Sequence, residues 1–201
     1  MVFMDIKKKQ LAHPKNAYQI KITLLDIEPP IWRRLVVPCN ITFHKFHKIL
    51  QVAMGWCDYH LYSFTIGGVH YGIPDPESEF DCQDSRWIKL EQVLMEKLEF
   101  TYVYDFGDNW EHKIRVEAMF PVEEWKRFTL CLYGERSCPP EDVGGTSGYC
   151  DFLEAIFNPR HPEHGRYLSW AGGEFDPEHF DIEAVNNELK KLGRGGSSQK
   201  G

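Results

Sequence analysis

The sequence contains no apolar run that approaches the roughly 20 residues needed to cross a bilayer. Residues 1–16 are polar and include three adjacent lysines, so they do not resemble a secretory signal. These absences predict a cytoplasmic protein with no membrane partner. We expect 1–16 to be a flexible segment, 17–192 to form a single α+β domain, and the Gly/Ser-rich stretch 193–201 to be a disordered tail.

Cysteine pairs and common catalytic signatures are also missing. None of the six cysteines forms a Cys-x-x-Cys pair, and the spacing of Cys131, Cys138 and Cys150 matches no common zinc site. There is no Gly-x-Ser-x-Gly elbow. The kinase tripeptide Asp-Phe-Gly at 105–107 lacks the glycine-rich and His-Arg-Asp loops that accompany it in kinases. A structural zinc site, a serine hydrolase and a kinase are therefore disfavoured.

Basic residues are too few to form a nucleic-acid-binding face by bulk charge. The chain has 23 Lys and Arg against 30 Asp and Glu, which gives a formal net charge of −7. Phosphate backbones attract clustered Lys and Arg, and the only clusters here are short ones near the two ends. Binding through bulk charge is disfavoured, although a local basic face is still compatible with the sequence.

Hydrophobic periodicity predicts both strands and helices. Apolar and polar residues alternate over 18–25 and over 98–104, and each stretch is followed by a partner strand after a turn. Helical spacing over 43–54 lies between Thr42, a typical N-cap, and Gly55, a typical helix end. The remaining expected strands are at 31–37, 60–66, 69–72 and 110–118. The remaining expected helices are a short one around 90–94, one that begins near 149, and two over 162–170 and 177–192.

The order of these elements predicts an α+β fold. We expect an antiparallel or mixed sheet built from two hairpins, with a helix packed on it and a helical C-terminal part. The N-terminal half, a hairpin followed by a helix, suggests a β-grasp-like arrangement.

The turn between 98–104 and 110–118 carries the carboxylates of Asp105 and Asp108, and His112 follows it. Asp and His side chains are common ligands of divalent metal ions. In a second interpretation, the two carboxylates accept hydrogen bonds from turn amides and His112 is a core histidine. The second interpretation is favoured, because aspartates stabilise turns often.

The glycine-rich loop at 139–148 is a second candidate. Gly144 and Gly145 precede a helix, where free backbone N–H groups bind anions, and Arg136 is near enough to balance Glu141 and Asp142. The competing interpretation is a rigid loop whose helix is capped by Thr146 or Ser147.

His60 is the third candidate. Its expected strand neighbours are apolar, which predicts burial at a strand end beside the acidic turn. Such a histidine suits a metal ligand or a general base, although a single histidine on an apolar face is more often structural. His60 and His112 are therefore the candidates for a catalytic role.

Aromatic and arginine side chains gather near the expected turns, and such residues are good anchors for a partner. Together with the helix-entry glycines, they form the predicted binding set: Trp32, Arg33, Trp56, Tyr104, Trp110, Arg136, Gly144, Gly145 and Tyr149.

Several motifs in this order resemble one family. They are Pro-Ile-Trp-Arg-Arg at 30–34, Met-Gly-Trp at 54–56, Tyr-Asp-Phe-Gly-Asp at 104–108, Pro-Pro-Glu-Asp at 139–142 and Phe-Asp-Pro at 175–177. The chain resembles the plasmid pRiA4b ORF-3-like proteins over about residues 18 to 190. The resemblance implies no established activity, cofactor or catalytic residue. It does imply an association with mobile elements, which is not a mechanism.

Two functions fit these observations. The favoured one is a non-catalytic binding or accessory module with an aromatic and acidic surface site, whose partner is a protein or a short nucleic-acid segment. The alternative is a metal-dependent hydrolase that acts on a phosphoester, with His60 or His112 as ligand or base. A divalent ion would be its cofactor, held by the carboxylates of Asp105, Asp108, Glu141 and Asp142. The alternative requires the acidic turn and the 139–148 loop to meet in space.

Overall fold

The computed structural model describes residues 16–75, 77, 81–121 and 129–194. The expected flexible segment 1–16 and tail 193–201 lie outside the described residues, apart from their inner ends. Asn16 is the first residue of a strand, and the last helix extends to Arg194.

The described strands form one eight-stranded sheet in the order β5-β4-β3-β6-β7-β1-β2-β8. All neighbours are antiparallel except β4 and β5. The strands are β1 (Asn16–Leu24), β2 (Trp32–Pro38), β3 (Tyr62–Ile66), β4 (Val69–Gly72), β5 (Gln83–Asp84), β6 (Glu99–Tyr104), β7 (Trp110–Pro121) and β8 (Leu130–Glu135).

The two expected hairpins are present, and they are joined into one sheet. β1 pairs with β2 and β6 pairs with β7, and β1 also pairs with β7 at the centre of the sheet. The β-grasp-like expectation covers only the first hairpin and the helix after it, whereas the full strand order extends beyond that arrangement. Strand β8 lies where the sequence pattern predicts no strand.

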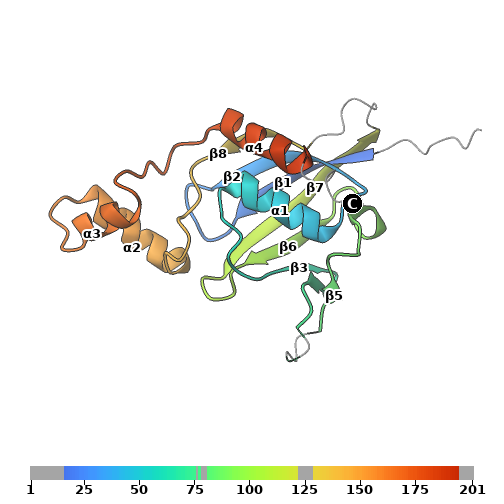
Figure 1. Ribbon diagram of the computed structural model, residues 1–201, viewed down its shortest axis with the longest axis horizontal. Coiled ribbons are helices and arrows are strands. Elements are labelled where there is room, and N and C mark those ends of the chain that lie inside the picture. Colours follow the sequence, from blue (N-terminus) through green and yellow to red (C-terminus); the bar gives the residue numbers. More distant parts are fainter. Residues whose placement is uncertain (1–15, 76, 78–80, 122–128, 195–201) are drawn as a thin grey trace, which may run out of the picture.

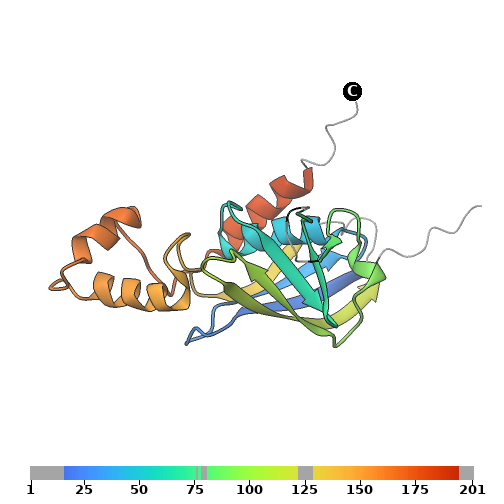
Figure 2. The same cartoon turned by 90° about the horizontal axis from the view of Figure 1, so that it is seen from below.

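The helix α1 (Phe43–Met54) forms where the sequence predicts it. The Thr42 side chain accepts a hydrogen bond from the Lys45 N–H, and Gly55 ends the helix with a φ of 96°. Its apolar side, which includes Phe43 and Phe46, is fully buried in the core. Figures 1 and 2 show α1 and α4 (Ile182–Arg194) on the same face of the sheet.

The helices α2 (Gly145–Phe157) and α3 (His164–Trp170) pack against each other beyond one end of the sheet (Figures 1 and 2). We call this pair the α2–α3 lobe. Phe152 packs against Tyr167 and Phe175 in its interior. A one-turn 3-10 helix, η1 (Leu90–Gln92), lies between β5 and β6 in the chain.

The last helix covers the edge of the sheet at β8. The Asn186 side chain accepts the N–H of Cys131 and donates to its carbonyl, as a neighbouring strand would. Helix α4 begins at Ile182 rather than at Pro177, and the Asp181 carboxylate accepts the N–H of Ala184 there. In the part of the chain that the structure describes, no helix is both long and apolar enough to cross a membrane.

Candidate functional site

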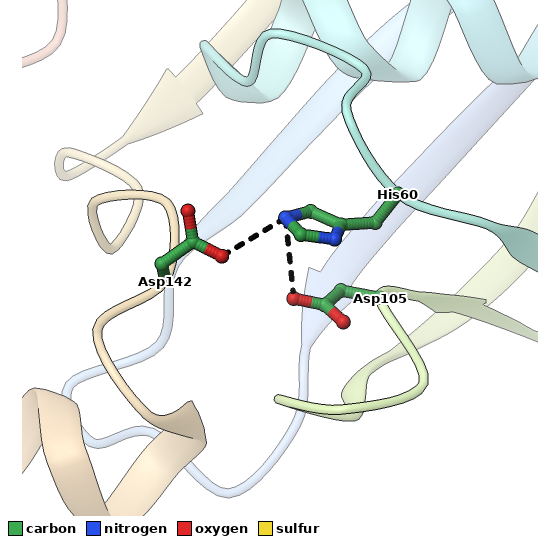
Figure 3. A group of neighbouring side chains, drawn as sticks. All are labelled: His60, Asp105 and Asp142. Atoms are coloured by element: carbon green, nitrogen blue, oxygen red, sulfur yellow. Dashed lines mark ion pairs between the residues drawn. The ribbon is translucent and has the colours of Figure 1, made fainter.

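Three connecting segments meet at the end of the sheet that faces the α2–α3 lobe. The first leads into β3, the second is the turn between β6 and β7, and the third is the loop that leads into α2. Figure 3 shows one side chain from each of them, His60, Asp105 and Asp142, directed toward a common point. The two acidic segments that the sequence marks therefore do meet in space.

The imidazole of His60 lies at the centre of this cluster. Its Nε2 atom is 3.0 Å from an oxygen of Asp142, 3.6 Å from one of Asp105 and 3.8 Å from one of Glu141. One ligand atom each from His60, Asp105 and Asp142 lies within 4.8 Å of the other two. We refer to these three residues as the His60 centre.

The Nε2 atom of His60 is buried, although the side chain as a whole is 29% exposed. None of the three nearby carboxylates is oriented to form a hydrogen bond with it, and no other described residue does so. A buried polar atom without a hydrogen bond is unfavourable, so its position calls for an explanation. The nitrogen and two of the carboxylates form the ion pairs drawn in Figure 3, and a metal ion between them would be a common partner for all three groups.

Backbone hydrogen bonds hold the segment around His60. The N–H of Asp105 donates to the carbonyl of Leu61, and the N–H of Tyr59 donates to the hydroxyl of Tyr104. Strand β3 begins at Tyr62, so His60 precedes the strand rather than lying in it as the pattern predicts. The ring can then turn toward the acidic loops instead of packing on the apolar face of the sheet.

Asp105 has a turn role and a site role at once. One carboxylate oxygen accepts the N–H of Gly107, as in an Asx-turn, and the other faces His60. The residue has a φ of 56°, which directs its side chain away from the strand it follows. The two interpretations of this aspartate are therefore compatible, because each uses a different oxygen.

Asp108 forms a hydrogen bond at the start of the α2–α3 lobe and is not part of the His60 centre. Its carboxylate accepts the N–H of Gly144, the residue before α2. The cap of this helix thus comes from the β6–β7 turn, whereas the sequence suggests Thr146 or Ser147. Gly145 has a φ of 68°, and a Cβ added there would lie 2.6 Å from the backbone oxygen of Asp108.

We expect Gly145→Ala to separate the turn from the lobe and to destabilise the protein. A left-handed φ costs a non-glycine residue about 1–2 kcal/mol, and the clash with a backbone oxygen adds about 1–3 kcal/mol. Urea denaturation measures the loss. Gly172→Ala is the matched control, because Gly172 has a φ of 86° and open space around its Cβ position. Equal losses in the two variants would contradict a tight turn–lobe contact.

Glu141 is fixed beside the His60 centre by two donors. Its carboxylate accepts the N–H of Cys57 at 2.7 Å and the hydroxyl of Tyr104 at 3.1 Å. Burial and the charge of Glu141 raise the pKa of Tyr104, so this tyrosine stays a neutral donor. Glu141 therefore has a fixed carboxylate next to the three residues of the His60 centre. Sequence reasoning missed Cys57, whose backbone N–H no pattern marks, and it predicted Tyr104 as an anchor for a partner rather than as a donor to Glu141.

His112 lies in the core and not in the cluster. It is fully buried, its Nδ1 lies 3.3 Å from the carbonyl oxygen of Tyr102, and its ring packs edge-on against Trp56. Burial lowers the pKa of His112 to about 4. This position corresponds to the core-histidine interpretation, and it leaves His60 as the one histidine of the predicted pair at the acidic loops.

Most of the predicted aromatic anchors are interior residues. Trp56, Tyr104, Trp110 and Tyr149 are all buried, and Trp56 donates to the carbonyl of Pro139. These side chains pack in the interior beneath the loops and are not exposed to a partner. Trp32 is half-buried on β2, distant in the chain from these loops, and its ring lies beneath the cationic groups of Lys21 and Arg34.

Neither predicted arginine faces the acidic loops with a free guanidinium. Arg136 pairs with Glu178 and donates to the carbonyl of Pro29. Arg33 is buried and donates to backbone carbonyls. The exposed residues around the His60 centre are instead Tyr59, Leu61 and Phe106, which the predicted set does not include.

The donor set of the His60 centre suits a divalent ion. One imidazole nitrogen and two carboxylate oxygens are ligands that zinc, manganese and iron accept. Three protein ligands leave further coordination positions unfilled by protein, which is typical of catalytic rather than structural metal sites. The residues present therefore fit such an ion.

Comparison with known proteins identifies relatives but no activity. The model of the family described as "Plasmid pRiA4b ORF-3-like protein" matches residues 16–184. "Uncharacterized protein y4hQ" of Sinorhizobium fredii (strain NBRC 101917 / NGR234) is 38% identical over 180 residues, covering 88% of this chain and 92% of that protein. The crystal structure of the protein of unknown function MM3350 from Methanosarcina mazei Go1 is 36% identical, has a TM-score of 0.76, and covers 84% of this chain and 97% of that one.

Proposed function

The chain belongs to the plasmid pRiA4b ORF-3-like protein family, and we propose that it binds a divalent metal ion at the His60 centre. The observation that carries this proposal is the buried Nε2 atom of His60, which has no hydrogen bond and has carboxylate oxygens of Asp142 and Asp105 at 3.0 and 3.6 Å. Two carboxylates this close to one another repel, and a cation between them would relieve that repulsion.

The surroundings of the centre support a binding or accessory role. Tyr59 and Leu61 flank His60 in the chain, Phe106 follows Asp105, and all three side chains are exposed. Apolar side chains around a charged centre are typical of surfaces that contact a partner. The partner proposed is a protein or a short nucleic-acid segment, held by these side chains next to the ion.

A metal-dependent hydrolase is the second candidate, and the accessibility of the centre favours it. Asp142 is 66% exposed, so a substrate and a water molecule can reach an ion at this position. Glu141, held by Tyr104 and Cys57, would be the base near such a water. For a phosphoester, the ion itself must neutralise the developing charge, because Arg136 is paired with Glu178.

Metal titration of the full chain tests the proposal. After treatment with EDTA and its removal, calorimetric titration with Zn²⁺, Mn²⁺ and Mg²⁺ should show one saturable site per chain for at least one ion. Elemental analysis after gel filtration gives the stoichiometry. Absence of saturable binding for all three ions would refute the site. Hydrolysis of bis(4-nitrophenyl) phosphate by the loaded protein then separates the two candidates: turnover supports the hydrolase, and its absence supports the binding module.

A further inference from the structure

A second feature of the molecule is a cavity of about 650 Å³ between the sheet and the α2–α3 lobe. Small-molecule sites in proteins are typically about 300–1,000 Å³, so its size suits a small organic ligand. The end of α1, the 137–142 loop, the start of α4 and the lobe border it. The lining residues that matter here are Arg33, Met54, Trp170, Phe175, Ala184 and Val185.

Arg33 is the buried charge in the wall of this cavity. It is 2% exposed, and its guanidinium donates to the carbonyls of Ala53, Trp32, Glu135 and Arg136. A guanidinium has five N–H groups, so one N–H on Nη2 is left after these four hydrogen bonds.

No carboxylate among the described residues pairs with Arg33. Arg34 and Arg136 differ in this respect. Arg34 pairs with Glu117 at 2.7 Å, and Arg136 pairs with Glu178 at 2.8 Å. Burial lowers the pKa of Arg33, as expected for a cation removed from water. A buried charge without a counter-ion is unfavourable, and an anion in the adjacent cavity would compensate it.

The acidic residues of the lining do not cancel this charge. Asp142 is 66% exposed and faces His60, and water screens it. Glu141 accepts hydrogen bonds from Cys57 and Tyr104, and Asp181 accepts one from Ala184 at the start of α4. The first turn of α4 also brings the positive end of a helix dipole to the same wall.

Much of the remaining wall is apolar, although Ser137 and His179 also line it. Trp170 is 46% exposed and, with Phe175 and Met54, gives the cavity aromatic and aliphatic surface. We infer that this cavity binds a small aromatic carboxylate, with its ring against Trp170 and Phe175 and its carboxylate next to Arg33. The inference does not depend on a metal ion at the His60 centre.

Three matched probes test the charge preference. Phenylacetate, phenylacetamide and phenethylamine share a ring and differ in charge, and calorimetry or ligand-observed NMR with the full chain measures their binding. We expect phenylacetate to bind at least about tenfold more tightly than the neutral amide, and the amine to bind most weakly. Equal binding of acid and amide, preference for the amine, or no saturable binding of phenylacetate would overturn the inference.

Two variants on the same helix test the location. Ala184→Phe adds a ring at an exposed lining position and should weaken phenylacetate binding about tenfold or more. Asn187→Phe adds the same bulk one turn further along α4, outside the cavity, and should leave binding unchanged. Circular dichroism confirms that both variants fold. An equal affinity of the two variants for phenylacetate would contradict the location.

Repeating the titration in EDTA separates this inference from the proposed metal site. Phenylacetate binding that persists in EDTA supports the Arg33 cavity, whether or not the His60 centre binds an ion. Phenylacetate binding that is lost in EDTA assigns the carboxylate to the ion and refutes the role of Arg33.

Discussion

The Asp142→Asn variant is expected to lose divalent-ion binding while keeping its fold. Removal of a hydrogen-bonded neighbour of a metal ligand already costs about 10–100-fold in affinity, so the loss of a ligand itself should cost on the order of 100-fold or more. Asp142 has a φ of 57°, a backbone conformation that asparagine adopts readily, and its side chain is 66% exposed. The free energy of unfolding without metal should therefore change by no more than about 0.5 kcal/mol.

The matched control is Asp151→Asn. Asp151 is exposed on α2, and the substitution makes the same charge change outside the His60 centre. Calorimetric titration with the ion that the wild-type protein binds compares the two variants, and thermal unfolding with and without that ion gives a second measurement. The site is refuted if both variants bind as the wild type does, or if Asp151→Asn weakens binding as much as Asp142→Asn.

The Arg33→Met variant is expected to be strongly destabilised. Its side chain donates four hydrogen bonds to backbone carbonyls, and three of them tie β2 to the end of α1 and to residues 135–136 at the end of β8. The guanidinium also stacks on Phe180, with its central carbon 4.1 Å from the ring centroid. Hydrogen bonds to charged groups contribute about 1.5–3 kcal/mol each, so the loss of several of them removes a large part of the stability of an ordinary domain.

Arg34→Gln provides the comparison, because Arg34 is the next residue on the same strand. Its partly exposed pair with Glu117 should contribute only about 0–1 kcal/mol. Urea denaturation followed by circular dichroism measures both variants. A loss for Arg33→Met as small as that for Arg34→Gln would show that the buried guanidinium does not hold these segments together.

Elements that depend on local interactions are predictable from the sequence. The ends of α1 are set by the Thr42 side chain and by Gly55, and both act within a few residues of their position. The same holds for the β1–β2 and β6–β7 hairpins, whose alternating patterns and turn residues are adjacent in the chain. Local propensity and tertiary packing agree at these places.

Strand β8 depends on distant parts of the chain. The absence of a side chain at Gly134 lets the ring of Phe180 and the side chain of Arg33 approach the strand. A Cβ at Gly134 would lie 2.6 Å from Phe180. Asn186 supplies hydrogen bonds to the outer edge at Cys131. These partners are distant in the chain from residues 130–135, so the local sequence pattern cannot predict the strand.

The aromatic residues near the turns illustrate the same limit. The sequence places Trp56, Tyr104 and Trp110 beside turns, where they resemble anchors for a partner. In the structure they pack on one another beneath the loops, with Trp56 and Tyr104 ring centroids 4.9 Å apart. Whether a ring beside a turn faces solvent depends on which segments fold over it, and here the 137–142 loop covers Trp56.

By itself, the sequence determined the α+β class, the family resemblance, and the two acidic segments that contain Asp105 and Asp142. Only the tertiary structure decided that Asp105 faces His60 while Asp108 caps α2. Both aspartates lie in one turn, and their roles differ because the backbone angle at Asp105 and the approach of Gly144 direct the two carboxylates to different partners. Those partners come from distant segments, so no local pattern encodes the choice.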